Sequence, residues 1–236
     1  VTNTEIYNNT ANIGAGIGAL SGNIKLDKVL IYGNNGDYGS AISLGEPLGL
    51  IVDTINMIIT NSTIANNNGN ISFGMIDNSN VIIANSIIWN NGNSEFTNLP
   101  NNSILNVDSF YSNINSSNNI DMENSISSDP MFIDYTNNNF NLTLSSPCVD
   151  TGTNSLIIDD NVIILISEYY GIMPDMGKYE LNTALGDLNQ DNIFNVQDII
   201  FMVNLVLANY YTYFADLNQD SIVNVLDIIS LINRKD

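Results

Sequence analysis

The sequence predicts a mostly β chain, in which a right-handed parallel β-helix of about five coils and a closing segment (residues 1–181) precede a small all-α domain (residues 182–236). Two observations predict this architecture. A motif of Ile, Asn and Gly recurs through the first half of the chain, and an aspartate-rich loop followed by an apolar segment occurs twice near the C-terminus, 29 residues apart. Repeats of this length typically stack into elongated folds or arrays.

The N-terminal repeat is aligned on Tyr7, Tyr32, Ala65, Trp89 and Tyr111, which are separated by steps of 25, 33, 24 and 22 residues. The longest step contains an insertion around "GEPLGLIVDT". Ile and Val favour strands, whereas Asn and Gly tolerate left-handed turns. One copy cannot bury its apolar face, but stacked copies form a core with ladders of Ile inside and Asn at the corners. A β-sandwich or a propeller fits less well, because a sandwich has turns every ~8–12 residues and propeller blades repeat at ~40–50.

A further pattern follows the repeats in "SISSDPMFIDYTNNNFNLTLSSPCVDTGTN", from Ser125, and "PDMGKYEL", from Pro174. With the repeats it resembles the pectate-lyase-like β-helix proteins of bacterial surfaces, many of which end in such a closing segment. The resemblance covers residues 1 to 181 and implies fold and export rather than activity. We expect the segment to cover the open strand edges of the last coil, and Cys148 to be a buried packing residue. The matching positions are Asp129, Pro130, Phe132, Ser146, Pro147, Cys148, Asp150, Gly152, Asp175, Gly177, Tyr179 and Glu180.

Composition narrows the classes of function. The chain has 25 Asp and Glu against 5 Lys and Arg, a formal net charge of −20, which argues against nucleic-acid binding because phosphates would be repelled. With no histidine and one cysteine, it lacks Ser–His and Cys–His nucleophile pairs, imidazole zinc sites and intrachain disulfides. No apolar run reaches transmembrane length. Lacking a signal peptide, the sequence is interpreted as a mature or truncated piece of an extracellular or cell-surface protein.

The C-terminal repeat has the ligand spacing of the calcium loop of an EF-hand. Oxygen-bearing side chains stand at positions 1, 3, 5, 9 and 12 of each copy, and position 7 would supply a backbone carbonyl. Because Ca²⁺ takes about six to eight oxygen ligands, we expect one ion in each loop, two in all, and folding that depends on them. The expected ligands are Asp187, Asn189, Asp191, Ile193, Asn195 and Asp198 in the first loop and Asp216, Asn218, Asp220, Ile222, Asn224 and Asp227 in the second.

Both loops depart from the ordinary EF-hand at two positions. Position 12 is Asp rather than Glu, and position 6 is Asn192 or Ser221 rather than Gly. Asn adopts a left-handed turn readily, whereas Ser does so at greater cost. We therefore expect the second loop to bind calcium more weakly or to be strained.

Two such loops, each followed by one apolar helix, resemble the dockerin module of secreted bacterial proteins over residues 186 to 234. The resemblance implies two calcium loop–helix units and a cohesin domain as partner. Positions 10 and 11 are Val196-Gln197 and Val225-Leu226 rather than the Ser-Thr pairs usual in clostridial members, so the partner is left unnamed. The first helix, "VQDIIFMVNLVLAN", is apolar nearly all round and should be buried on two sides, by the second helix and by the β-helix cap or a partner.

Two functions remain in contention. The first is an exported, non-catalytic structural or adhesion-type protein, attached through its calcium module to a cohesin-like domain or assembled head to tail with neighbouring copies. The second is a polysaccharide lyase or glycoside hydrolase with an accessory docking module. Lyases of the family it resembles use an Arg or Lys base, and this region offers only Lys25, Lys28 and Lys178, with Asp27–Lys28 as the best pair. No two acids recur at a spacing that suits a two-carboxylate glycosidase, so we expect no catalysis.

Overall fold

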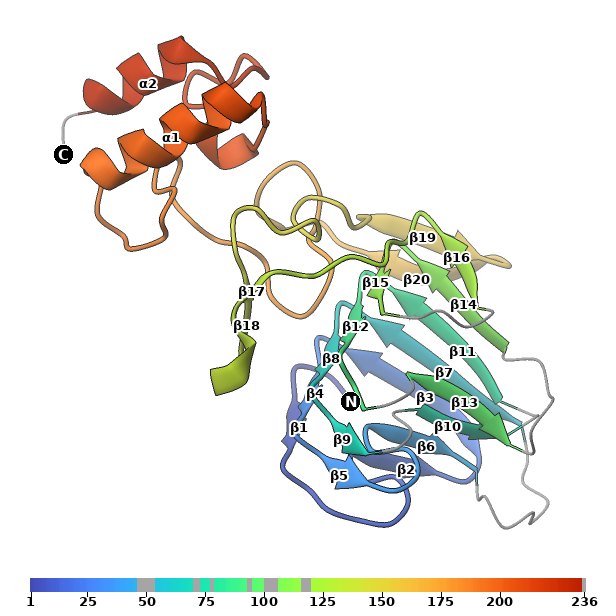
Figure 1. Cartoon of the computed structure of the whole chain (residues 1–236). Helices are drawn as coiled ribbons and strands as arrows, with labels where there is room; N and C mark the ends of the chain where they lie inside the picture. Colours follow the sequence, from blue (N-terminus) through green and yellow to red (C-terminus); the bar gives the residue numbers. More distant parts are fainter. Residues whose placement is uncertain are drawn as a thin grey trace. The chain divides into compact units, whose positions relative to one another are not determined.

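The computed structural model divides the chain into two compact units, each described here by itself. Unit 1 comprises Val1–Tyr169 and Met173–Glu180, and unit 2 comprises Tyr170–Ile172 and Leu181–Asp236. The described part of the chain is mostly β, with parallel sheets in unit 1 and two α-helices in unit 2 (Figure 1), and no described helix is long and apolar enough to cross a membrane. The residues that the structure describes are 1–45, 54–69, 73–76, 79–92, 95–99, 106–115 and 120–234.

Three parallel sheets form the body of unit 1, and the chain visits them in the same order on each of its first four passes (Figure 1). Sheet 1 contains β1 (Glu5–Tyr7), β4 (Leu30–Tyr32), β8 (Thr63–Ala65), β12 (Ile87–Trp89) and β15 (Asn113–Ile114). Sheet 2 contains β2 (Ile17–Ala19), β6 (Ile42–Leu44), β10 (Phe73–Ile76) and β13 (Phe96–Leu99). Sheet 3 contains β3 (Gly22–Asp27), β7 (Ile55–Thr60), β11 (Ser79–Ala84), β14 (Asn106–Phe110) and β16 (Asp121–Glu123). A short parallel pair, β5 (Asn35–Gly36) and β9 (Asn68–Gly69), lies between strands of sheets 1 and 2 in the chain.

The strand register of sheet 1 tests the alignment of the repeats. Tyr7 pairs with Tyr32, Tyr32 with Ala65, and Ala65 with Trp89, so the first three predicted steps are confirmed. The fifth anchor, Tyr111, is wrong, because it precedes β15 and adopts a left-handed turn with φ 49°. Pairing of β12 with β15 starts at Ile87 and Asn113, so the aliphatic ladder sets the register and the surface aromatic does not. The inserted stretch "GEPLGLIVDT" lies almost wholly outside the described residues.

Aliphatic ladders between the sheets form the core of unit 1. In sheet 1, one isoleucine from each strand stands beside the next in register, and all but the first are fully buried. In sheet 3, Leu26, Ile59 and Ile83 form a second buried column. The prediction of Ile ladders inside the stack is therefore confirmed. The sheet 1 column consists of Ile6, Ile31, Ile64, Ile88 and Ile114.

A second column consists of asparagines at the corner after sheet 1. The Nδ2 atom of Asn9 donates to Oδ1 of Asn34, Asn34 to Asn67, and Asn67 to Asn91, at 2.8–2.9 Å. The last three are at most 1% exposed. The ladder ends on Glu95, whose carboxylate accepts from the backbone N–H of Asn91 at 3.0 Å and from its Nδ2 at 2.9 Å. Burial raises the pKa of Glu95 to about 7, against the opposing effect of these hydrogen bonds. The prediction of Asn at the corners is confirmed.

The corner between sheet 3 and sheet 1 is a short turn with one left-handed residue in each pass. Two residues separate the strands at each of these corners, as between β3 and β4 or between β7 and β8. The first of the two has a φ between 46° and 55°, which Asn tolerates better than other non-glycine residues. These left-handed residues form a column along the stack, together with the equivalent residues at its two ends. The column consists of Asn3, Lys28, Asn61, Asn85, Tyr111 and Asn124.

The segment after the repeats packs along the outer faces of the sheets. The hairpin of β17 (Phe132–Asp134) and β18 (Asn139–Leu142) brings Phe140 against Tyr32, with ring centroids 5.4 Å apart. The hairpin of β19 (Ser155–Ile158) and β20 (Asn161–Leu165) covers Ile58 and Ile82 of sheet 3. Cys148 is fully buried, as predicted.

The expectation that this segment covers the last coil is confirmed in part, because Ile126 and Ser128 hydrogen-bond to residues 112–114 at its edge. Among the described residues, β16 and a bridge between Ile126 and Asn113 extend the sheets beyond β14 and β15. The outer faces of the sheets also carry apolar residues such as Leu30 and Ile87, and the rest of the segment packs on these.

Unit 2 contains two loop–helix copies, with α1 at Val196–Ala208 and α2 at Val225–Ile232. Each helix begins at an asparagine N-cap, Asn195 or Asn224, whose side chain accepts from the backbone N–H two residues further on. An aspartate at the third helical position accepts from the N-cap N–H in return, which completes a capping box. The two helices pack against each other.

Candidate functional site

The two aspartate-rich loops of unit 2 have the same hydrogen bonds at equivalent positions. At position 1, the Asp187 carboxylate accepts from the backbone N–H of Asp191 at 3.2 Å and from that of Asn192 at 3.0 Å. The loop therefore wraps around this carboxylate. In the second loop, Asp216 accepts from the N–H groups of Asp220 and Ser221 at 3.0 and 2.8 Å.

The aspartate at position 12 joins the start of each loop to the start of its helix. Asp198 Oδ1 accepts from the N–H of Leu188 at 2.8 Å, and its Oδ2 accepts from the N–H of Asn195 at 2.9 Å. Asp227 repeats both bonds, at 2.9 Å each, with Leu217 and Asn224. The structure therefore joins position 12 of each copy to position 9 and to position 2, the neighbour of position 1.

Four of the loop carboxylates are buried. Asp187, Asp198, Asp216 and Asp227 are at most 3% exposed. None of them forms an ion pair in the described part of the chain, where the ion pair found joins Lys178 to Glu5 in unit 1. Burying an ionised carboxylate is costly unless a positive charge or a metal compensates it. The donor set therefore fits a hard cation such as Ca²⁺.

Carboxylates alone do not complete either site. No group of three or more His, Cys, Asp or Glu side chains placed to hold a metal occurs among the described residues. A cation in the first loop would also need the amide oxygens of Asn189 and Asn195 and the carbonyl of Ile193. Two of the expected ligands lie together, since Nδ2 of Asn189 donates to Oδ2 of Asp191 at 2.8 Å.

Position 6 adopts the left-handed conformation that glycine usually supplies there. Asn192 has φ 63° and Ser221 has φ 66°, so both copies keep the turn without glycine. Gln190 and Gln219, at position 4, are left-handed as well, with φ 62° and 58°. Ser adopts this conformation at greater cost than Asn, so we expect more strain at position 6 of the second loop.

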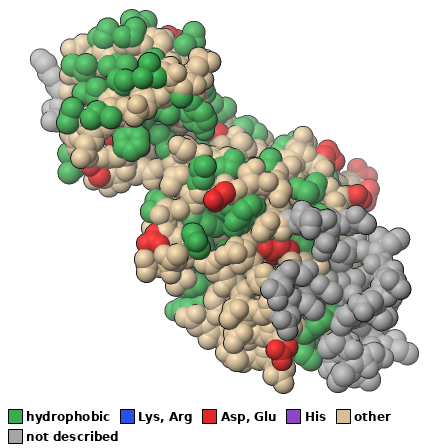
Figure 2. Space-filling model, viewed as in Figure 1, with side chains coloured by type: hydrophobic (Ala, Val, Ile, Leu, Met, Phe, Trp, Pro, Cys, Tyr) green, Lys and Arg blue, Asp and Glu red, His purple; other side chains and the backbone are tan. Residues whose placement is uncertain are grey.

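Each copy also presents a stripe of apolar side chains that unit 2 leaves exposed. On α1 only Asp198 and Met202 are buried, and on α2 only Asp227 and Leu231. The stripe members are 37–79% exposed and recur at helical spacing from position 7 of the loop onward. Figure 2 shows apolar side chains gathered on the surface of this unit. The stripes are Ile193, Val196, Ile200, Val203 and Leu207 in the first copy and Ile222, Val225, Ile229 and Ile232 in the second.

The sequence predicted an apolar helix buried on two sides, whereas α2 covers only part of α1 inside unit 2. The repetition of exposed positions was missed because both faces of α1 are apolar in sequence. The signal was available in the second copy, where the same positions recur 29 residues later.

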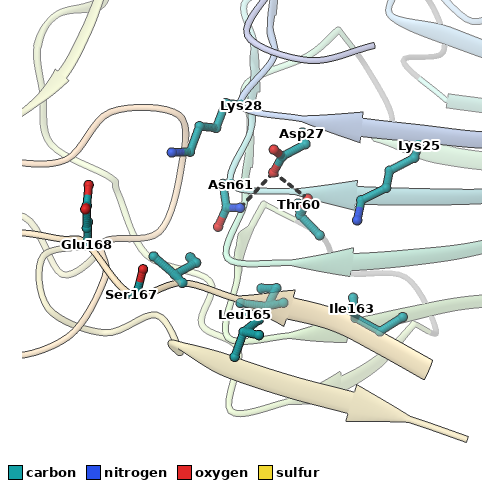
Figure 3. Close-up of a pocket in the computed structure, with 11 residues that line it drawn as sticks. Lys25, Asp27, Lys28, Thr60, Asn61, Ile163, Leu165, Ser167 and Glu168 are labelled. Atoms are coloured by element: carbon teal, nitrogen blue, oxygen red, sulfur yellow. Dashed lines mark hydrogen bonds between the residues drawn. The ribbon is translucent and has the colours of Figure 1, made fainter. Parts of the chain in front are cut away.

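The candidate catalytic pair of unit 1 lies at a cavity of about 310 Å³ (Figure 3). Asp27 Oδ1 accepts from Thr60 Oγ1 and from Asn61 Nδ2, each at 2.8 Å. Lys25 and Lys28 line the same cavity, whereas Lys178 does not. The opposite wall was not predicted, because its residues are distant in sequence. The lining residues are Lys25, Asp27, Lys28, Thr60, Asn61, Ile163, Ile164, Leu165, Ile166, Ser167 and Glu168.

The chain thus has two places with the chemistry of a site, the paired loops with their helix stripes in unit 2 and the charged cavity in unit 1. The paired loops are defined by their repeated hydrogen bonds, and the cavity is defined by the residues that line it. No protein-family model, curated protein or solved structure matches the chain.

Proposed function

We propose that the protein is exported and non-catalytic, that unit 1 is a right-handed parallel β-helix, and that unit 2 is a dockerin-like module that binds two Ca²⁺ ions and docks the chain onto a partner. The observation that carries the proposal is the repetition within unit 2. The same carboxylate hydrogen bonds and the same exposed stripe recur at an interval of 29 residues.

Calcium binding is supported by buried carboxylates that have no ion-pair partner among the described residues. In the first loop the ligands would be Asp187, Asn189, Asp191, the Ile193 carbonyl, Asn195 and Asp198; in the second they would be Asp216, Asn218, Asp220, the Ile222 carbonyl, Asn224 and Asp227. When bound, the ion supplies positive charge that offsets the three carboxylates of each loop. Position 12 then couples charge neutralisation to helix formation, because Asp198 and Asp227 also complete the capping boxes. Such a module suits an extracellular or cell-surface setting, where calcium is plentiful.

Docking is supported by the two exposed stripes. Contiguous apolar patches on a soluble protein mark interaction surfaces, and a helix stripe fits into a partner's groove or against its sheet. The partner is a cohesin-like domain or a neighbouring copy of the chain. Binding through the helices would depend on calcium, because the loops set where each helix starts.

A calcium titration of the full chain tests the first part. After chelation, we expect calorimetry to count two ions and the helical circular dichroism of α1 and α2 to rise as calcium returns. Asp187→Asn should remove one ion, whereas Asp160→Asn, with the same charge change at an exposed turn of unit 1, should remove none. Absence of calcium uptake, or full helicity in the chelated protein, would contradict the proposal.

A binding experiment tests the second part. Purified cohesin domains and the chain itself are the two partners, measured with and without calcium by calorimetry and size exclusion. Ile200→Glu and Ile229→Glu should abolish the interaction, whereas Asn182→Glu, at an exposed position of unit 2 outside both helices, should spare it. A calcium-loaded monomer that binds no cohesin would refute docking.

The polysaccharide-active alternative rests on the cavity beside Lys25 and Asp27. A depolymerisation assay on polyuronates with calcium decides between the two functions. We expect no turnover, and turnover that Lys25→Gln or Asp27→Asn abolishes would favour the enzyme.

A further inference from the structure

The cavity of unit 1 forms where the apolar cover of sheet 3 ends. In the register of that sheet, Lys25 stands beside Ile58, and Asp27 stands beside Thr60. The β19–β20 hairpin packs on Ile58 and on Ile82 of the next strand. It does not bury the charged side chains of the edge strand β3, and a cavity of about 310 Å³ remains between them and the stretch Ile163–Glu168.

Lys28 stands at a position where the fold favours another residue. It belongs to the column of left-handed turn residues, four of whose six members are Asn, and its φ is 55°. A lysine in the left-handed conformation costs free energy. The turn does not require an ammonium group, because Asn occupies four of the six equivalent positions. The lysine does place an ammonium group at the cavity. Strained residues of this kind cluster at functional sites.

Both lysines of the cavity keep their positive charge unpaired. Neither Lys25 nor Lys28 forms an ion pair in the described part of the chain, although acidic residues outnumber basic ones by 25 to 5. Figure 3 shows the side chains of Lys25, Asp27 and Lys28 along one wall, with Leu165 and Glu168 along the other.

Hydrogen bonds fix the Asp27 carboxylate through one of its two oxygens. Its Oδ1 accepts from Thr60 and Asn61, whereas no described residue donates a hydrogen bond to its Oδ2. Across the cavity, Glu168 adds a second carboxylate acceptor, and Ile163 and Leu165 add apolar surface. The cavity therefore offers two cations, two anionic acceptors and an aliphatic wall.

We propose that this cavity binds a hydroxylated carboxylate, either an acidic sugar residue of a glycan or a free hydroxy acid. Its carboxylate lies against the ammonium groups of Lys25 and Lys28, its hydroxyls donate to Asp27 Oδ2 and Glu168, and its carbon skeleton packs on Leu165. A phosphate dianion is disfavoured relative to a carboxylate, because Asp27 and Glu168 repel its double charge more strongly. The volume is at the lower end of the ~300–1,000 Å³ found for ligand pockets, which suits a single sugar-sized unit.

The test uses the full chain in calcium buffer and three probes measured by calorimetry and saturation-transfer NMR. D-gluconate represents a free hydroxy acid, methyl β-D-glucuronoside represents a sugar within a chain, and methyl β-D-glucoside is the neutral match of the second. We expect one or both carboxylates to bind with a dissociation constant on the order of 1 mM, and the glucoside to bind at least about fivefold more weakly. The carboxylate that binds more tightly identifies the source of the ligand.

Variants separate the cavity from the net charge of the chain. Lys28→Asn restores the usual turn residue, so the fold is kept, and it should weaken binding at least about fivefold, as should Lys25→Gln. Lys178→Asn makes the same charge change away from the cavity and should leave binding unchanged. Failure of both carboxylates to bind, equal binding of the glucoside, or equal loss in Lys178→Asn would overturn the proposal. Acetate, added as a carboxylate without hydroxyls, should bind more weakly than gluconate, and equally tight binding would overturn the role given to the hydroxyls. None of these outcomes depends on calcium uptake or docking by unit 2.

Discussion

Replacing Asn67 by alanine removes the middle of the buried asparagine ladder. Its Oδ1 accepts from the backbone N–H of Asn34 at 3.1 Å and from the Nδ2 of the same residue at 2.9 Å. Its own Nδ2 donates to Asn91 at 2.8 Å and to the Ile31 carbonyl at 3.0 Å. In the variant, the Asn34 N–H loses its acceptor and the Ile31 carbonyl loses this donor, at a corner that water does not reach.

The expected loss of stability is about 3–5 kcal/mol, since each buried polar group left without a partner costs about 1–3 kcal/mol and the ladder is a connected network. An exposed ladder supplies the matched control. Asn56 joins Asn23 and Asn80 through the same Nδ2-to-Oδ1 bonds, at 3.0 and 2.9 Å, but its side chain is open to solvent. Asn56→Ala should stay within about 0.5 kcal/mol of the parent protein, because water replaces the lost partners.

Urea unfolding followed by the fluorescence of Trp89 measures both variants. This is the only tryptophan of the chain and lies in β12, so the signal reports unit 1 alone. The shift of the midpoint multiplied by the slope gives the change in the free energy of unfolding. Equal effects of the two substitutions would refute the idea that burial makes one ladder structural and leaves the other nearly neutral.

The remaining predictions concern three other positions. Ser221→Gly should relieve the left-handed strain of the second loop and stabilise unit 2 by about 1 kcal/mol, seen as a higher melting temperature, and a lower one would contradict the assignment of strain. Because the pKa of Glu95 is raised from 4.5 to about 7, the native state keeps a proton that the unfolded chain loses, so stability should fall by up to about 1.4 kcal/mol per unit as pH rises through that window. Glu95→Gln should remove this dependence, and an unchanged slope in denaturation curves would refute it. Burial raises the pKa of the Cys148 thiol to about 11, so iodoacetamide should label it only as unit 1 unfolds, and rapid labelling of the native protein would contradict its burial.

Local repetition made the strands and loops predictable from the sequence. Register from Tyr7 to Trp89 follows a spacing that can be read directly, and the Asp and Asn positions of the paired loops identify the turns that precede α1 and α2. Tyr111 was misaligned because the weak fifth copy was matched on its aromatic residue, whereas packing aligns the buried isoleucines.

The cavity and the stripes depend on which distant segment covers which face, and the sequence carries little information on that. Asp27 and Lys28 were recognisable only as a charged pair until Ile163–Glu168 was placed opposite them. In the same way, the exposure of Ile200 and Ile229 depends on how α1 and α2 share the small interior of unit 2.

The left-handed corners also determine where the stack can accept extra chain. Two residues join β3 to β4, and the same number recurs at each later corner between sheet 3 and sheet 1. The longest repeat instead takes its additional residues between β6 and β7, at the corner from sheet 2 to sheet 3. One corner thus fixes the pitch of the stack, while another can lengthen without disturbing the ladders, so new loops could be grafted between sheets 2 and 3 at little cost to the core.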